Sequence, residues 1–584
     1  MARTVAIGIQ NYSELIEKNY FYIDKTDFIR EWWENGDSVT LIARPRRFGK
    51  TLNMSMLEKF FSNKYQHRGD LFEKLAIWKY EKYRNLQGTY PVIYLSFANM
   101  KENTYEKIME KIYRLLTDLY EQHQYLLDSN VLGDSSVDYF KRININMSEV
   151  DAALSIHHLS DYLSRYYGKK VIILLDEYDT PMQEAYVNGY WNEFTSFIRN
   201  LFNSTFKTNP YLERALMTGI TRVSKESIFS DLNNLEIVTT TSDKYATAFG
   251  FTEEEVFSAM DEMEIGEKEN VKKWYDGFVF GAKRDIYNPW SIINYLDKKR
   301  LNTYWADTSS NSLVAKLIRE GASDIKQLFE DLLSGKPIEV PINEQLVYSE
   351  LGEDETAIWS LLLAAGYLKV LSYQNGEQAP ENEYPLYQLA ITNYEVKKMF
   401  DRMVSGWFGK VRKNYNDFIK ALLIGDLDAM NEYMERVTVQ IFSSFDTGGK
   451  GNDTNEESIN TVNDKNEQIR RTSEPERFYH GFVLGLMVDM SENYIIKSNR
   501  ESGFGRYDIL LYPKKQNMGN GIIIEFKVRK KKSEADLEAT VQAALRQIEE
   551  KNYAAELNDL GFTEENIRKY GFAFDGKQVL IGEV

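Results

Sequence analysis

Short apolar runs alternate with longer amphipathic stretches over the first 250 residues of the chain. Three of the runs, at 39–42, 92–95 and 171–175, are only four or five residues long. Runs of this length between segments of helical period are typical of buried parallel strands covered by helices. The pattern therefore predicts an α/β domain over residues 1–250, with a P-loop NTPase-like parallel sheet and helices on both faces.

The middle of the chain, residues 251–440, is mostly helical in pattern. Thr252 precedes a run of glutamates, and Glu255 stands three positions after it, which is the spacing of a capping box at a helix start. Residues 358–370 followed by 387–389 have the pattern of a small helix and strands. We therefore expect a helical, winged-helix-like middle section.

The last predicted domain covers residues 441–584. Its first part, 446–475, is polar and rich in Gly and Asn, which predicts a flexible segment. Residues 476–584 then have the pattern of a helix, two strands, a long helix and a hairpin. We expect Ser533 to cap the long helix and Asp575-Gly576 to form the hairpin turn.

Composition narrows the possible functions. The chain has 584 residues, no cysteine and five histidines, which excludes disulfides and thiol nucleophiles and leaves little room for a histidine-only metal cage. A formal net charge of −17 excludes a uniformly basic nucleic-acid coat but allows a local basic groove. Neither a signal-like N-terminus nor a run of 18 apolar residues occurs, so we expect a soluble, cytoplasmic protein with no membrane partner.

A strand, a loop ending in Gly-Lys-Thr and a helix follow one another near the N-terminus; we call residues 43–51 the GKT loop. In such a loop backbone N–H groups face a phosphate, Lys50 reaches its oxygens and Thr51 ligates magnesium. Gly49 allows the phosphate to approach the backbone. Arg44 stands where the usual motif has its first glycine, so the loop alone could also be a basic surface turn.

A second element favours nucleotide binding. The apolar run 171–175 leads directly into Asp176 and Glu177, as in a buried strand that delivers carboxylates at its end. Asp176 would hold magnesium, and Glu177 would orient or deprotonate the attacking water. Alone these residues could form an ordinary acidic loop. Together with the GKT loop they predict that ATP and Mg²⁺ are cofactors.

Other polar residues could contact the γ-phosphate. Thr218 ends a third candidate strand and could sense this phosphate, and Arg222 could stabilise charge developing on it. Arg46 and Arg47 could bind phosphates or form a solvated turn, and Arg222 could equally lie in a surface ion pair. Because Arg222 could act on a neighbouring copy's nucleotide, a homo-oligomer stays open.

Several segments together resemble the predicted AAA-ATPase-like family of bacterial and archaeal proteins, over about residues 3–300. They read IGIQNYSELIEKNYFYIDKTDFI, LIARPRRFGKT, ILLDEYDTP, MTGITRVSKESIFSDLNNL, WYDGF and YNPWS. The family's loop reads Arg-Pro-Arg-Arg-Phe-Gly-Lys, so Arg44 follows the family. The resemblance implies nucleotide binding at Gly49, Lys50, Thr51, Asp176 and Glu177.

A second group of chemical residues lies on two candidate strands near the C-terminus. Asp508 falls at the start of one strand, and Glu525 and Lys527 alternate along the next, so these two share a face while Phe526 points into the core. Two carboxylates with a lysine beside them could hold Mg²⁺ or Mn²⁺ and a water opposite a scissile phosphate. By itself the pattern fits edge-strand ion pairs better.

Neighbouring features favour the metal site. Glu476 and His480 lie four apart on a predicted helix and share a face that could cover the site. The basic run 529–532 could bind phosphates that flank the cut. Gln547 and Tyr553 could contact the backbone or Lys527. Each feature also has a structural interpretation: His480 could be a hydrogen-bonded core histidine, the basic run a solvated loop, and Gln547 a surface residue.

These C-terminal segments resemble the PD-(D/E)XK nuclease superfamily, in the branch found C-terminal to this ATPase-like domain. They read ERFYHGFVLGL, NRESGFGRYDILL, IIIEFKV and ALRQIEEKNY. The resemblance implies a restriction-endonuclease-like α/β fold. It also implies these roles: metal ligation by Asp508 and Glu525, catalysis by Lys527, completion of the site by Glu476 or His480, and support from Gln547. The six-residue spacing from Gln547 to Tyr553 exceeds the Gln-x-x-x-Tyr of some relatives, which leaves Tyr553 open.

The sequence thus predicts an ATPase and metal-dependent nuclease that cleaves nucleic acid, with DNA favoured over RNA, under control of its nucleotide state. One alternative is an ATP-dependent switch or scaffold that binds nucleic acid or a protein without cleavage. Another is an ATPase motor with a vestigial nuclease fold.

Overall fold

The computed structural model describes residues 3–220, 232–308, 323–343, 357–373, 385–407, 415–441, 494–502, 505–514, 519–531, 533–576 and 578–584, with single positions at 229, 314, 317, 318, 483 and 487. The chain divides into two compact units, residues 1–399 and 400–584. The predicted flexible segment 446–475 lies outside the described residues. In the part that is described, no helix has both the length and the apolar character needed to cross a membrane.

A five-stranded parallel sheet forms the centre of the first unit, in the order β2-β3-β4-β1-β5. Its strands are β1 (Val39–Ala43), β2 (Val92–Ser96), β3 (Val171–Asp176), β4 (Leu212–Gly219) and β5 (Leu235–Val238). Every residue of β1 and β3 is buried, because both faces of the sheet are covered. The predicted α/β fold is confirmed.

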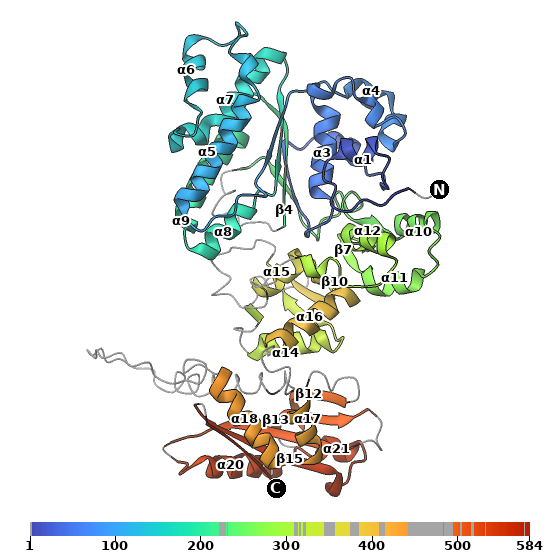
Figure 1. Cartoon of the computed structure of the whole chain (residues 1–584), viewed down its shortest axis with the longest axis vertical. Coiled ribbons are helices and arrows are strands. Elements are labelled where there is room, and N and C mark those ends of the chain that lie inside the picture. Colours follow the sequence, from blue (N-terminus) through green and yellow to red (C-terminus); the bar gives the residue numbers. More distant parts are fainter. Residues whose placement is uncertain are drawn as a thin grey trace, which may run out of the picture. The chain divides into compact units, whose positions relative to one another are not determined.

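Helices lie on both sides of these strands (Figure 1). One side carries α1 (Tyr12–Glu17), α3 (Lys50–Phe61) and α4 (Glu81–Leu86), and the other α5 (Tyr105–Glu121), α7 (Glu149–Tyr167) and α9 (Trp191–Phe202). The remaining helices of this region are α2 (Asp27–Asn35), α6 (Asp134–Arg142) and α8 (Thr180–Asn188). In α5 the buried positions Ile108, Ile112 and Leu116 repeat every four residues, which explains why this segment folds as an amphipathic helix.

The middle section contains helices and two small antiparallel sheets. Its first part has β6 (Phe251–Thr252), α10 (Glu253–Glu262), α11 (Lys268–Tyr275), β7 (Phe278–Phe280), β8 (Lys283–Tyr287) and α12 (Pro289–Lys298). Its second part has α14 (Ser323–Leu333), β9 (Ile338–Pro341), α15 (Ala357–Ala364), β10 (Leu368–Tyr373), β11 (Leu386–Ile391) and α16 (Tyr394–Trp407). The predicted capping box at Thr252 and Glu255 is present, so α10 begins where its sequence indicates.

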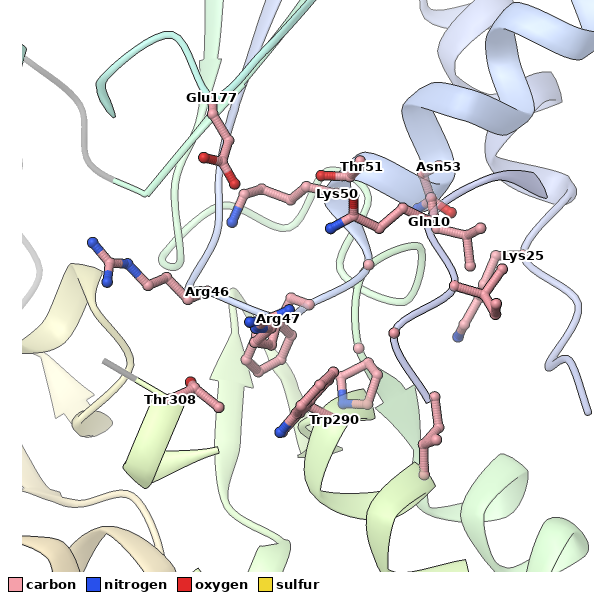
Figure 2. Close-up of a pocket in the computed structure, with 18 of the residues that line it drawn as sticks. Gln10, Lys25, Arg46, Arg47, Lys50, Thr51, Asn53, Glu177, Trp290 and Thr308 are labelled. Atoms are coloured by element: carbon pink, nitrogen blue, oxygen red, sulfur yellow. The ribbon is translucent and has the colours of Figure 1, made fainter. Parts of the chain in front are cut away.

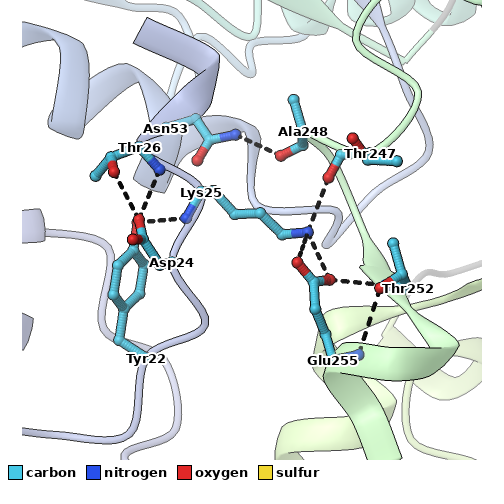
Figure 3. Close-up of polar contacts among 9 residues, drawn as sticks. All are labelled: Tyr22, Asp24, Lys25, Thr26, Asn53, Thr247, Ala248, Thr252 and Glu255. Atoms are coloured by element: carbon cyan, nitrogen blue, oxygen red, sulfur yellow. Dashed lines mark hydrogen bonds and ion pairs between the residues drawn. The ribbon is translucent and has the colours of Figure 1, made fainter. Parts of the chain in front are cut away.

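An ion pair between a buried lysine and a half-buried glutamate joins the N-terminal segment to α10 (Figure 3). Lys25 is 8% exposed and donates to both carboxylate oxygens of Glu255, at 2.8 and 2.7 Å, and to the carbonyl oxygen of Thr247 at 2.8 Å. Burial lowers the pKa of Lys25, and the Glu255 carboxylate opposes that effect. Glu255 therefore both caps α10 and fixes the segment that precedes α2.

A buried carboxylate attaches the middle section to the GKT loop. Glu395, at the start of α16, accepts hydrogen bonds from the Ser291 hydroxyl and from the backbone N–H groups of residues 304–306. Burial raises the pKa of Glu395 to about 7, and these donors oppose the shift. Trp305, held in this way, donates its indole N–H to the carbonyl oxygen of Arg46 at 2.9 Å.

The second unit is built on a mixed five-stranded sheet in the order β12-β13-β14-β15-β16. The strands are β12 (Tyr494–Ser502), β13 (Gly505–Pro513), β14 (Gly521–Val528), β15 (Ile567–Asp575) and β16 (Gln578–Glu583), and the helices are α17 (Tyr415–Ile424), α18 (Leu427–Ile441), α20 (Leu537–Glu550) and α21 (Ala555–Asp559). Strands β14 and β15 are parallel, and the other neighbours are antiparallel.

The two faces of this sheet pack against different helices because alternate residues point to opposite sides. On β14, Ile524 and Phe526 belong to a core that includes residues of α17 and α18, whereas Ile523 packs with α20. Phe526 is thus buried in the core, as the sequence predicted. The helices α17 and α18 come from residues within the expected middle section.

Two local details differ from the sequence prediction. The helix α20 begins at Leu537 and is capped by Asp536 rather than Ser533, because the Asp536 side chain accepts the N–H of Ala539. In the C-terminal hairpin Asp575 pairs with Gln578, so the two linking positions are 576 and 577. Position 577 lies outside the described residues.

Candidate nucleotide and nuclease sites

The GKT loop turns into α3 through a glycine in the left-handed conformation. Gly49 has φ of +82° and is the N-cap residue of the helix. A Cβ added there would meet nothing within 4 Å, so the backbone conformation, rather than crowding by the protein, requires glycine. This refines the sequence argument, which relied only on the close approach of a phosphate.

Arg44 stands at the position of the usual first glycine. Its side chain is fully buried and anchors the GKT loop to the segment at residues 239–244. Its guanidinium donates to the carbonyl oxygens of Thr239 and Lys244 and lies 4.4 Å from the ring centre of Phe280. Burial lowers the pKa of Arg44 to about 9. The Arg44 guanidinium is therefore occupied by these protein contacts, and its place in the loop is explained without a contact to phosphate.

Lys50 is held against the carbonyl oxygens of its own loop. Its Nζ donates to those of Arg44 and Pro45, each at 2.8 Å, and the residue is 7% exposed. Burial lowers the pKa of Lys50 to about 8, and the neighbouring Asp179, Glu177 and Asp176 only partly oppose this.

We therefore expect the affinity for a nucleoside triphosphate to fall as the pH rises through about 8. A bound triphosphate would keep Lys50 protonated, whereas the free protein loses this proton above its lowered pKa. Binding then takes up a proton, and each pH unit above the pKa weakens it by up to about tenfold. Calorimetry at pH 7 and pH 9 measures the change. Lys50→Ala is the control, because without the ammonium group the affinity, although weaker, should no longer depend on pH in this range; equal affinities of the unmodified protein at both pH values would contradict the prediction.

Thr51 of α3 meets Asp176 and Thr218, which lie at the ends of the adjacent strands β3 and β4. Strand β4 lies between β1 and β3, with Thr218 paired to Ile42. The hydroxyl of Thr51 donates to Asp176 Oδ2 at 2.7 Å, and that of Thr218 donates to Oδ1. Burial raises the pKa of Asp176, and both hydroxyls oppose the shift. Carboxylate and hydroxyl oxygens fit a magnesium ion, which prefers such ligands.

The other predicted residues of this site are less constrained. Glu177 has φ of +52°, and its carboxylate accepts the Thr180 hydroxyl at 3.2 Å. Arg46 is exposed and donates to Gln183 at 3.4 Å, while the guanidinium of Arg47 lies 4.4 Å from the ring centre of Trp290. Arg222 lies outside the described residues, so its role stays a prediction.

A cavity of about 400 Å³ opens beside the GKT loop (Figure 2). Lys50, Thr51 and Glu177 line it together with residues that the sequence analysis did not identify: Gln10, Lys25, Asn53, Trp290 and Thr308. Gln10 and Trp290 fall in the segments IGIQ and YNPWS, which carry the family resemblance without an evident chemical role. Only the fold brings these segments to the loop.

In the second unit the register of β13 and β14 pairs Ile509 with Ile524. Continued by one residue, it sets Asp508 opposite Glu525 on the same face, where Cβ atoms of directly paired residues lie roughly 5 Å apart. Asp508 Oδ2 also accepts the N–H of Phe526 at 2.8 Å, which holds its carboxyl group against β14. Two carboxylates in this position fit a divalent ion.

Gln547 of α20 connects the other residues of the site. Lys527 Nζ donates to Gln547 Oε1 at 2.5 Å, and Gln547 Nε2 donates to Glu525 and lies 3.1 Å from the Tyr553 hydroxyl. Tyr553, which the spacing left open, therefore joins the group. Its pKa is raised by burial and by the charges of Glu525 and Asp508.

A glycine brings α20 close enough for these contacts. Gly571 pairs with Glu525 across β14 and β15, and a Cβ on it would fall 2.9 Å from the carbonyl oxygen of Val541. Any larger residue would push α20 away from the sheet and separate Gln547 from Lys527.

The remaining predicted residues of the nuclease site are only partly described. Glu476 and His480 lie outside the described residues, so the choice of third ligand stays a prediction. In the basic run, Arg529 and Lys531 both form ion pairs with Asp575. These two cations brace the hairpin in addition to any contact with phosphate.

The parallel sheet and GKT loop have the fold of a P-loop NTPase-like domain, and the mixed sheet of the second unit brings Asp508, Glu525 and Lys527 to adjacent strands. Residues 6–229 match the family described as predicted AAA-ATPase, and residues 474–584 match the PD-(D/E)XK nuclease superfamily. The chain thus contains an AAA-ATPase-like domain and a PD-(D/E)XK nuclease superfamily domain, and both resemblances are confirmed. An uncharacterized protein from the vnfD 5′ region of Azotobacter chroococcum mcd 1 is 26% identical over 402 residues, 68% of each chain.

Proposed function

We propose that this protein binds and hydrolyses ATP and cleaves nucleic acid in a magnesium-dependent reaction controlled by its nucleotide state. The two domain families support ATPase and nuclease potential. The observation that carries the nuclease half is the joining of Lys527 and Glu525 through Gln547, on the sheet face that Asp508 shares.

In the nuclease site Asp508 and Glu525 would hold the divalent ion, Mg²⁺ or Mn²⁺. When bound, such an ion supplies a Lewis acid and a water of lowered pKa. Lys527 would orient the attacking water or offset negative charge at the phosphate. Gln547 fixes the lysine by accepting from its ammonium group, so Lys527 needs little reorganisation during the reaction.

In the nucleotide site Lys50 would exchange its two carbonyl partners for phosphate oxygens. Thr51 and Asp176 would hold the magnesium ion, and Thr218 would sense the γ-phosphate beside them. Glu177 lines the same cavity and would orient the attacking water, which makes ATP hydrolysis rather than binding alone the expected activity.

Control by nucleotide state is supported by bonds between the GKT loop and the middle section. The carbonyl oxygen of Arg46 accepts from Trp305 at 2.9 Å and from Asn288 at 3.4 Å. The ring of Phe48 packs edge-on against Phe278, with 4.8 Å between ring centres. A loop that changes shape around phosphates would alter these contacts, and such differential contacts are what coupling requires.

An assay on the purified chain tests the proposal. Plasmid, linear and single-stranded DNA, and RNA, are incubated with and without Mg²⁺, Mn²⁺ and ATP. We expect fragments only when a divalent ion is present, at a rate that ATP changes. Binding without fragments would favour the switch or scaffold, and ATP hydrolysis stimulated by DNA without fragments would favour the motor; either result would refute the nuclease half.

A further inference from the structure

The carbonyl oxygen of Arg46, in the GKT loop, is held by two segments of the middle section. Asn288, the N-cap residue of α12, donates to it at 3.4 Å, and the indole N–H of Trp305 donates at 2.9 Å. Neither side chain lines the cavity, and they are only 0% and 3% exposed. Both residues therefore bind the backbone of the loop rather than a ligand.

Both segments are bound to the same carboxylate, that of Glu395. One of its oxygens accepts the hydroxyl of Ser291, in the first turn of α12, at 2.8 Å. The other accepts the backbone N–H groups of residues 304–306, with 2.7 Å to that of Trp305. We call this group the Glu395 network; its members are Arg46, Asn288, Ser291, Trp305 and Glu395. Because Ser291 and Glu395 are fully buried, water cannot replace a lost bond, and a shift of the loop carbonyl must either move Glu395 or leave a buried group without its partner.

The segment that carries Trp305 also reaches the cavity beside the GKT loop. Thr308 lines this cavity and donates its hydroxyl to the carbonyl oxygen of Trp305 at 2.7 Å. The indole ring of Trp305 packs edge-on against Phe278, with 5.4 Å between ring centres, and Phe278 in turn packs against Phe48 of the loop. A change in the cavity can therefore act on Trp305 through Thr308 as well as through the loop.

Glu395 is the second residue of α16, which begins at Tyr394. The division between the two compact units falls inside this helix, between Met399 and Phe400. A helix moves as a stiff element, because hydrogen bonds join each turn to the next. A displacement of Glu395 would therefore be carried along α16 past the point at which the second unit begins.

We propose that Glu395 is a positioning residue that transmits the nucleotide state of the GKT loop to α16. When phosphates enter the loop and change the shape of its backbone, the Arg46 carbonyl shifts, and Trp305 and Glu395 shift with it. Such control requires that the Glu395 network differ between the empty and the occupied loop. The inference rests on the proposed function, since it names the route by which the nucleotide state would control cleavage.

Hydrogen exchange on the full, unmodified chain tests the network, with and without ATP and Mg²⁺. We expect saturating ATP to change the exchange rates of the backbone amides of residues 304–306 and 394–399 by roughly fivefold or more, the effect of gaining or losing one hydrogen bond. The amides of α6, which has no residue in the network, should keep their rates. Unchanged rates in residues 304–306 and 394–399 while ATP is bound would overturn the proposal.

Trp305→Phe removes the indole donor and keeps an aromatic ring. We expect its ATP affinity to stay within about threefold and its cleavage without ATP to be unchanged, whereas the factor by which ATP changes the cleavage rate should shrink by roughly fivefold. Trp32→Phe is the matched control. Trp32 is also buried, and its indole N–H has no hydrogen-bond partner among the described residues.

The outcomes distinguish the role of the Glu395 network from the proposed function. If the unmodified chain does not bind ATP or does not cleave nucleic acid, the proposed function fails, and the role of the network with it. If it does both and Trp305→Phe keeps a normal ATP response, only the role of the network is overturned. A loss of ATP binding in Trp305→Phe would also overturn that role, because the indole would then only support the binding loop. The exchange measurement on the unmodified chain decides the point even if Trp305→Phe does not fold.

Discussion

Asp508→Asn should reduce cleavage of nucleic acid by about three orders of magnitude while the protein stays folded. The substitution keeps the side-chain volume and can still accept the N–H of Phe526, but it removes one of two negative charges that would hold the divalent ion. Cleavage is measured as fragment release from labelled DNA in Mg²⁺, and thermal unfolding shows whether the fold is intact. Asp559→Asn, an exposed aspartate of α21, is the matched control.

The neighbouring residues give a graded series that distinguishes catalysis from a structural role. Lys527→Ala should abolish cleavage, while Gln547→Ala should lose roughly 10- to 100-fold, because it removes only the group that orients the lysine and Glu525. Lys551→Ala, at an exposed position, should leave the cleavage rate unchanged. Full activity of Asp508→Asn or Lys527→Ala would exclude these residues from the reaction and with them the nuclease proposal.

Lys50→Ala should weaken ATP binding by about 100-fold or more and abolish ATP hydrolysis. The ammonium group is buried beside the loop carbonyls and would supply a charged contact to the phosphates in a site with little competing water. Calorimetry gives the affinity and phosphate release gives the hydrolysis rate. Lys64→Ala, an exposed lysine just after α3, is the control.

The same variant tests whether the nucleotide state controls cleavage. If it does, DNA cleavage by Lys50→Ala should no longer respond to ATP, although its nuclease residues are unchanged. Unaltered ATP affinity would refute the phosphate-binding role of the GKT loop. A normal ATP response of cleavage in a variant that cannot bind ATP would instead refute the coupling.

Much of the candidate phosphate site could be predicted from the sequence because its residues are close together in the chain. The strand, the GKT loop and the helix are contiguous, and Asp176 follows directly from a buried run, so pattern alone indicated both. The carbonyl partners of Lys50 also lie in its own loop. In contrast, the cavity wall at Gln10 and Trp290 joins residues that are 280 positions apart, and no local spacing reports such a contact.

The sequence by itself determined the element types, the capping box of α10, and the alternation that sets Glu525 and Lys527 on one face and Phe526 in the core. Periodicity and local hydrogen bonding decide such features, and both can be read along a few consecutive residues. Only the tertiary structure decided that Asp508 faces Glu525, that Gly571 admits α20, and that Arg44 is a buried anchor. Strand register and close packing depend on residues distant in the chain, so they become definite only when the sheets and helices assemble.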